Sequence, residues 1–146
     1  MIQVGVIGAG HCSQEIERMA EEVGKEIARK GAILICGGLG GVMEAAARGA
    51  KAEGGLAVGI LPGPTKDGMN RFIDVAVVTA MGHGRNVVIA HSADALIAVG
   101  GGYGTLSEIA IGMKLNKRVV GLRSWDIQGI INAEQPGEAV DLALAC

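Results

Sequence analysis

The sequence predicts a single α/β domain of the Rossmann type, with a parallel sheet covered by helices on both faces. Short, continuously apolar segments alternate with segments of helical periodicity, which is typical of strands buried on both sides. Most of the apolar segments end in glycine-rich turns. With 146 residues, 49% of them hydrophobic, the chain suits one core and one domain, residues 1–146.

Six apolar segments are expected to form the strands of this sheet. The expected strands are residues 3–7, 32–36, 56–61, 73–78, 95–99 and 118–122. Spacing and composition predict helices over residues 13–30, 42–53, 84–91 and 106–114. Residues 132–137 are expected to separate this core from a short final helix.

Charge and aromatic content argue against nucleic acid as a partner. The net charge is −2, and only three aromatic residues occur, Phe72, Tyr103 and Trp125. Binding to a polyanion needs clustered basic residues, and stacking of successive bases needs aromatic platforms. A small molecule is therefore the better expectation.

The cysteines and the hydropathy of the chain predict a cytoplasmic protein. Cys12, Cys36 and Cys146 are odd in number and widely spaced, which fits free thiols in a reducing compartment better than a zinc site or a disulfide framework. No apolar run reaches the length of a membrane span, and the first nine residues lack the basic start of a secretion signal. We expect neither a structural metal nor a membrane partner.

Four glycine-rich segments follow expected strands, at residues 8–10, 37–41, 82–85 and 100–105. In open parallel sheets the ligand lies beyond the carboxyl ends of the strands. The four segments are therefore expected on one rim of the sheet, around one binding site.

The loop at residues 100–105 carries the strongest signal for a bound phosphate. It lies between a strand and a helix, so that backbone amides and the positive end of the helix dipole can converge on one anion. The residues expected to bind are Gly100, Gly101, Gly102, Tyr103, Gly104 and Thr105. A tight turn without a ligand is the alternative, although four glycines in five residues exceed what a turn requires.

Thr105 and Glu108 allow two interpretations. Their spacing matches a capping box, in which each side chain satisfies a backbone amide at the helix start. Alternatively, the Glu108 carboxylate lies one turn into the helix and is able to orient water or stabilise an oxocarbenium-like sugar during N-glycosidic cleavage. The residues alone leave both open.

Arg85 follows the third glycine-rich segment, where its guanidinium suits a phosphate or a ribose oxygen. A surface ion pair is the alternative. His83 is expected to be a hydrogen-bond donor of the loop rather than a catalytic acid or base.

The first two glycine turns complete the predicted site. The first resembles a dinucleotide fingerprint, but the second strand lacks the terminal acidic residue that would hold a ribose, so an NAD enzyme is not expected. Ser13 either binds ligand or caps the following helix, and residues 37–41 either wrap the ligand or allow close helix packing. The remaining predicted binding residues are Gly8, Gly10, Ser13, Gly37, Gly38, Gly41, Met43, Arg85 and Asn86.

Three motifs, GGLGGVM at 37–43, HGRN at 83–86 and GGGYGTLSE at 100–108, resemble those of the "lonely guy" phosphoribohydrolases, once labelled possible lysine decarboxylases. The resemblance implies release of the base from a nucleoside 5′-monophosphate, with Glu108 and Arg85 catalytic and no required cofactor. Gly100 stands where that family usually has proline, and Asn86 where it has lysine.

A second resemblance, to the molybdenum-cofactor carrier proteins, rests on GVMEAAARGA at 41–50 and VGILPGP at 58–64. It implies a non-catalytic carrier whose ligand is the molybdenum cofactor, a phosphate-bearing pterin, or a related phosphorylated molecule. Both resemblances imply a homo-oligomer, and DNA processing protein A is similar in fold. A vestigial phosphate site is the third possibility.

Overall fold

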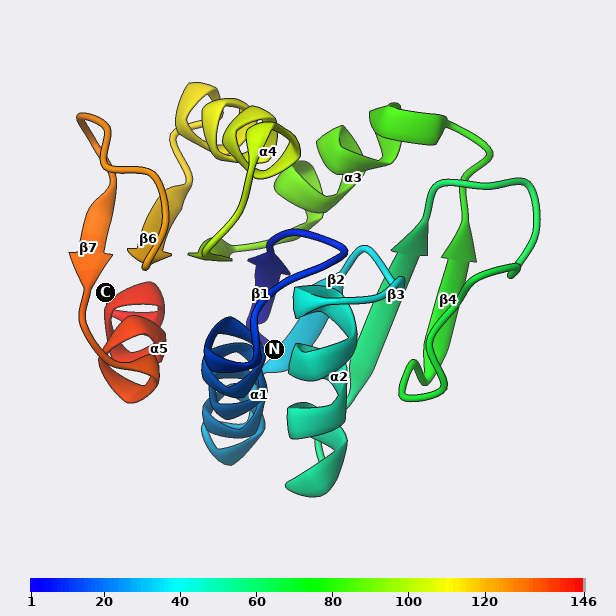
Figure 1. Cartoon of the computed structure of the whole chain (residues 1–146), viewed down its shortest axis with the longest axis horizontal. Helices are drawn as coiled ribbons and strands as arrows, with labels where there is room; N and C mark the ends of the chain where they lie inside the picture. The colour runs from blue at the N-terminus through cyan, green and yellow to red at the C-terminus, as the bar shows by residue number, and fades with distance from the viewer. Residues whose placement is uncertain (146) are drawn as a thin grey trace.

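Seven parallel strands form one continuous sheet between two layers of helices (Figure 1). This computed structural model describes residues 1–145. The strands are β1 (Gln3–Ile7), β2 (Ile33–Cys36), β3 (Ala57–Leu61), β4 (Val75–Val78), β5 (Ala95–Val99), β6 (Arg118–Leu122) and β7 (Ile131–Ala133). Their order is β4-β3-β2-β1-β5-β6-β7, and every pairing is parallel. The predicted Rossmann-like α/β architecture is confirmed.

Five α-helices cover the two faces of the sheet (Figure 1). One layer holds α1 (Gln14–Arg29), α2 (Val42–Ala52) and α5 (Pro136–Leu144), and the other holds α3 (Arg85–Ser92) and α4 (Tyr103–Lys114). A short 3-10 turn, Gly82–Gly84, precedes α3. Within residues 1–145, no helix combines the length and the apolar character needed to cross a membrane.

The chain changes direction across the sheet between β1 and β5. From β1 it proceeds through β2 and β3 to β4 at one edge, and then returns to the other side of β1 for β5. Such a reversal leaves a crevice beyond the carboxyl ends of the two central strands, where open α/β sheets bind ligands. The glycine turns after β1 and β5 face this crevice.

Two expectations from the sequence are wrong in the second half of the chain. Residues 131–133 form β7, which pairs with β6, where a separating loop was expected. Helix α4 begins at Tyr103, three residues before the predicted start. The first turn of α4 is helical although it contains Gly104, because packing against the sheet outweighs the low helix propensity of glycine.

The first helix begins where a capping residue predicts it. The backbone N–H of Ile16 donates to the Oγ of Ser13 at 3.2 Å, and Glu15 and Glu17 lie in the first turn, near the positive end of the helix dipole. Ser13 therefore acts as the N-cap of α1.

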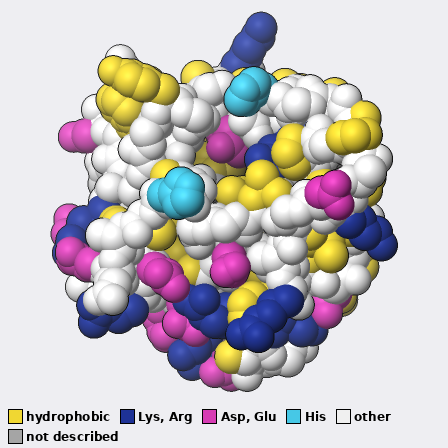
Figure 2. Space-filling view, turned by 45° about the vertical axis from the view of Figure 1, so that its right-hand side comes forward, with side chains coloured by type: hydrophobic (Ala, Val, Ile, Leu, Met, Phe, Trp, Pro, Cys, Tyr) yellow, Lys and Arg dark blue, Asp and Glu magenta, His cyan; other side chains and the backbone are white. Residues whose placement is uncertain are grey.

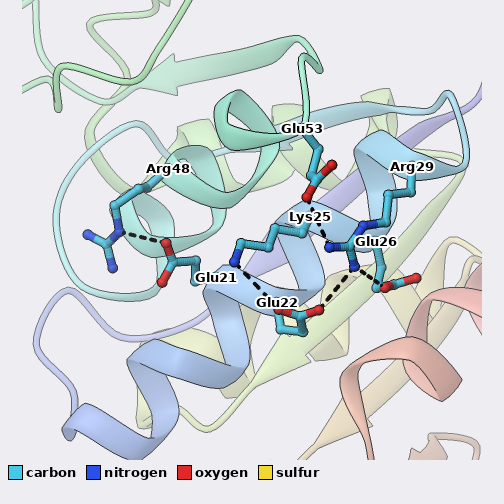
Figure 3. Close-up of polar contacts among 7 residues, drawn as sticks. All are labelled: Glu21, Glu22, Lys25, Glu26, Arg29, Arg48 and Glu53. Atoms are coloured by element: carbon cyan, nitrogen blue, oxygen red, sulfur yellow. Dashed lines mark hydrogen bonds and ion pairs between the residues drawn. The ribbon is translucent and has the colours of Figure 1, made fainter.

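Glycines allow α1 and α2 to pack with their backbones in contact. A Cβ at Gly24 would lie 2.0 Å from the carbonyl oxygen of Ala46, and a Cβ at Gly49 would lie 1.9 Å from that of Glu21. Side chains bridge the same pair of helices at its solvent edge (Figure 3). Arg29 contacts Glu22, Glu26 and Glu53, while Arg48 contacts Glu17 and Glu21. These exposed pairs add little stability individually, so the close backbone packing is the main feature of this interface.

Candidate functional site

A cleft of about 380 Å³ lies at the carboxyl ends of the central strands, a size typical of small-molecule sites. All four predicted glycine-rich segments reach it. Most of the predicted site residues line it: Gly8, Gly10, Gly37, Met43, Arg85, Asn86, Gly102, Gly104, Thr105 and Glu108. Figure 2 shows a hollow on this side of the molecule, with a basic and an acidic side chain close together among hydrophobic ones.

The N-terminus of α4 forms one wall of the cleft and has the geometry of an anion site, so it is called the anion-binding wall below. Gly102 is the N-cap, and its position provides no side-chain cap for the helix. The amides of Tyr103, Gly104 and Thr105 are the first of the helix and have no acceptor within it. Ideal Cβ atoms at Gly102 and Gly104 would meet nothing within 4 Å. An anion is therefore able to approach these amides through open space.

The capping-box interpretation of Thr105 and Glu108 is wrong. Because α4 begins at Tyr103, Thr105 is the third residue of the helix and cannot be its N-cap. Its side chain is buried, with 3% exposed. It lies under the loop at residues 100–105, called the anion loop below, where a Cβ at Gly101 would come within 2.4 Å of it. Thr105 thus supports the loop from below, and Glu108 is left free to face the cleft.

Glu108 is the acidic group of the cleft. Burial raises its pKa to about 7, and the nearby positive charge of Arg85 opposes this shift only partly. A carboxyl group with this pKa is about half protonated at neutral pH, so it is able both to donate and to accept a hydrogen bond.

Arg85 ties together the ends of two strands. Its Nη1 donates to the carbonyl oxygens of Gly37, at 2.5 Å, and Ile60, at 2.7 Å, and its Nε donates to Oδ1 of Asn86 at 2.7 Å. Burial lowers the pKa of the guanidinium, and Glu108 partly offsets this. No carboxylate in residues 1–145 lies within 4.0 Å of it, so the surface ion pair considered for Arg85 is wrong. Its guanidinium borders the cleft while it fixes the rim.

Six predicted binding residues lie outside the cleft lining, and four of them are glycines that the backbone conformation of the turns requires. Gly38, Gly41, Gly100 and Gly101 all have positive φ angles, which other residues rarely adopt. At Gly41 a Cβ would also lie 2.2 Å from the carbonyl oxygen of Ala9. These glycines allow the turns to approach one another. The other two outside the lining are Ser13, the cap of α1, and Tyr103, which is exposed.

Other cleft residues were not predicted. Val6, Ile7, Ala9, Leu39 and His83 also line it. Val6 and Ile7 end β1, directly before the predicted glycine turn at residues 8–10. Because ligands lie beyond the carboxyl ends of parallel strands, the sequence could have indicated both residues. His83 was predicted only as a donor of its loop.

Two side chains from the loop after β6 hold the anion loop from its outer side. The hydroxyl of Ser124 donates to the carbonyl oxygen of Gly100 at 2.6 Å, and Nε1 of Trp125 donates to that of Gly102 at 3.0 Å. Both carbonyl oxygens, which would repel an anion, are thereby engaged outside the cleft. No sequence motif indicates these contacts, because the acceptors are backbone atoms more than 20 residues away.

In the part of the chain that the structure describes, no group of three or more His, Cys, Asp or Glu side chains is arranged to hold a metal ion. The polar groups of the cleft are backbone amides together with the side chains of His83, Arg85, Asn86, Thr105 and Glu108. Such a cleft suits an organic ligand that carries a phosphate.

The fold and the cleft define a Rossmann-type α/β protein with a glycine-lined cleft at the switch point of its sheet. The chain belongs to the SLOG cluster4 family, whose family model matches residues 1–144. A relative from Archaeoglobus fulgidus, described only as an uncharacterized protein, is 56% identical over 146 residues, which cover 99% of this chain and 96% of that one.

Solved structures agree with this assignment. The molybdenum cofactor binding protein from Rippkaea orientalis is 34% identical, with a TM-score of 0.92 over 97% of this chain and 94% of that one. The molybdenum cofactor carrier protein from Chlamydomonas reinhardtii is 36% identical, with a TM-score of 0.88 over 95% and 93%. DNA processing protein A from Streptococcus pneumoniae is 17% identical, with a TM-score of 0.77 over 95% and 60%, and shares the fold alone. Both predicted resemblances are confirmed at the level of the family.

Proposed function

We propose that this chain is a non-catalytic carrier of the molybdenum cofactor or of a closely related phosphorylated pterin. One observation carries the proposal: Nε and Nη1 of Arg85 are engaged by the protein itself, whereas the first amides of α4 face open space. The cleft thus combines a free anion-binding wall with a rim that is already fixed. The likeness to two structures described as molybdenum cofactor binding and carrier proteins supports the choice of ligand.

The residues present fit such a ligand. The phosphate would lie at the N-terminus of α4, against the amides of Tyr103, Gly104 and Thr105. The pterin would lie between the first and second glycine turns, where Met43 and Leu39 provide apolar contact and backbone groups are available to its ring nitrogens. The two cysteines in the described chain, Cys12 and Cys36, are free thiols, which supports our proposal of a cytoplasmic location.

The second candidate function is hydrolysis of a nucleoside 5′-monophosphate. It is favoured by Glu108, which lies one turn behind the anion wall with a pKa of about 7, a value suited to proton transfer near neutral pH. It is disfavoured by the uncharged Asn86, whose Oδ1 is engaged by Arg85.

Binding and turnover measured on the same protein distinguish the two functions. We expect the wild type to bind molybdenum cofactor at micromolar concentration or tighter, and to release no free base from AMP, GMP, CMP or UMP above the rate of a protein-free blank. Binding is followed by equilibrium filtration and base release by chromatography. Base release that Glu108→Gln abolishes and Glu53→Gln, at an exposed carboxylate, leaves unchanged would show hydrolysis and contradict the carrier.

We also propose that the chain self-associates through the face of β4. Val75 and Val77 are in register with Val58 and Ile60, so their side chains lie on the face of the sheet that α3 and α4 cover elsewhere. Their side chains are exposed, as are those of Met81 and Val87, at 39% to 52%. Sheets of this class are normally covered on both faces. The four exposed side chains form an apolar strip that a partner would cover.

A second copy of the chain is the occupant that fits this strip. Residues 75–82 contain no charged side chain. The strip can therefore pack against the same strip of a second copy without charge repulsion, and it provides no ion pairs for a charged partner. Light scattering after size exclusion is expected to show a multiple of 14.8 kDa for the wild type and a single chain for Val77→Lys. Leu56→Lys, at a similarly exposed position before β3, is the control. A monomeric wild type, or an oligomer unchanged by Val77→Lys, would count against this interface.

A further inference from the structure

Two of the three aromatic residues lie together on the outer side of the anion loop, where Tyr103 is exposed and Trp125 is half-buried against the core. Tyr103 is 83% exposed, and the centroid of its ring is 5.9 Å from that of Trp125, with 33° between the ring planes. The third aromatic residue, Phe72, packs against the core beneath the guanidinium groups of Arg48 and Arg71. Packing against the core explains the position of Trp125, but it does not explain the exposed Tyr103 beside it.

The aromatic pair is held in a fixed position relative to the anion loop. The indole N–H of Trp125 donates to the carbonyl oxygen of Gly102 at 3.0 Å, and the preceding Ser124 binds that of Gly100 at 2.6 Å. Tyr103 is the first residue of α4, so its own amide belongs to the anion-binding wall. A group attached to the outer side of a phosphate on this wall would therefore emerge beside the two rings.

A second hollow, of about 340 Å³, lies at the ends of β6 and β7, and its lining includes the two sequence neighbours of Trp125, Ser124 and Asp126. Its polar lining includes Asp126, Asn132 and Glu134, and Nδ2 of Asn132 donates to Oδ1 of Asp126 at 3.1 Å. Arg123, also in the lining, has a left-handed backbone with φ of 54°, a conformation that costs energy and gathers at functional positions. Carboxylate and amide oxygens here suit the amino and ring N–H donors of a heterocycle.

We propose that Tyr103 and Trp125 form a stacking platform for a planar nitrogen heterocycle joined to the outer side of the bound phosphate, as in a dinucleotide. The heterocycle stacks on the two rings, and its amino edge faces Asp126 and Asn132. The platform rests on the proposed phosphate site and extends it: the cleft holds one half of the ligand, and the second hollow receives the other half. Stacking of one base on aromatic side chains strengthens binding by roughly tenfold or more.

Calorimetric titration with three probes tests the platform. The probes are inorganic pyrophosphate, AMP, and diadenosine diphosphate, which carries a second adenosine on the outer phosphate. We expect diadenosine diphosphate to bind about ten times tighter than AMP, and to quench the fluorescence of Trp125, the single tryptophan of the chain. Tyr103→Ala should remove this tenfold advantage, and Tyr103→Phe should keep it, with pyrophosphate binding equal in all variants. Ile127→Ala, at an exposed apolar position nearby, is the control.

The outcomes separate this inference from the proposed function. If pyrophosphate binds but diadenosine diphosphate gains nothing over AMP, or gains equally in Tyr103→Ala, the platform is overturned and the anion site stands. If the wild type binds none of the three probes, the phosphate site and the platform fail together.

Discussion

Replacing Gly104 by leucine is expected to abolish binding of phosphate-bearing ligands without lowering the stability of the fold. Gly104 is the second residue of α4, and its Cβ would enter open space at the cleft wall. A leucine side chain would occupy the position of the anion, which forfeits at least two charge-assisted hydrogen bonds, each worth about 1.5–3 kcal/mol. The affinity for pyrophosphate or for the molybdenum cofactor should fall by about 100-fold or more. Helix propensity favours leucine over glycine by roughly 0.5–1 kcal/mol, so thermal unfolding should occur at the same or a slightly higher temperature.

The chain contains a matched control for this variant. Gly137 is the second residue of α5, and its Cβ would also meet nothing within 4 Å, but it lies outside the cleft lining. Gly137→Leu should show the same small change in unfolding temperature and unaltered affinity. Full binding by Gly104→Leu would show that the anion does not lie at the N-terminus of α4.

The second large effect is expected on stability. Gly24→Ala should destabilise the protein by about 3 kcal/mol, because the new methyl group would lie 2.0 Å from the carbonyl oxygen of Ala46 and the neighbouring backbone of α2 cannot yield as a side chain would. The gain in helix propensity, about 1 kcal/mol, is already included in this net value. Thermal unfolding followed by circular dichroism should shift down by roughly 10 °C.

Gly137→Ala is the comparison for this prediction, since it adds a methyl group to a helix without a contact. It should be neutral or slightly stabilising. Gly49→Ala, whose methyl group would lie 1.9 Å from the carbonyl oxygen of Glu21, should behave like Gly24→Ala. An unchanged unfolding temperature in both variants would mean that α1 and α2 are free to move apart at little cost.

Much of the fold could be predicted because its strands are continuously apolar. Six of the strands carry runs of valine, isoleucine, leucine and alanine that few other structures would bury. The seventh, β7, has three residues, of which only Ala133 is buried, and so short an edge strand has too little pattern to be recognised. The start of α4 was missed because Gly104 lies in its first turn, where the sequence favours a loop.

The position of the candidate site followed from topology, and its internal contacts did not. Glycines after strands indicate one rim whatever the details of packing. The partners of Arg85, however, are the carbonyl oxygens of Gly37 and Ile60, and every residue has such an oxygen. Only the three-dimensional arrangement shows which of them the guanidinium reaches.

The hydrogen bonds of Arg85 to the ends of β2 and β3 have a kinetic consequence. They fix the rim before any ligand arrives, so little conformational entropy remains to be lost on binding, and association requires no slow closing motion. Dissociation would then require only that the contacts of the ligand break, without an opening of the rim. Transfer of a ligand from this cleft would therefore depend on competition by a recipient, because the hydrogen bonds of Arg85 hold the rim in place.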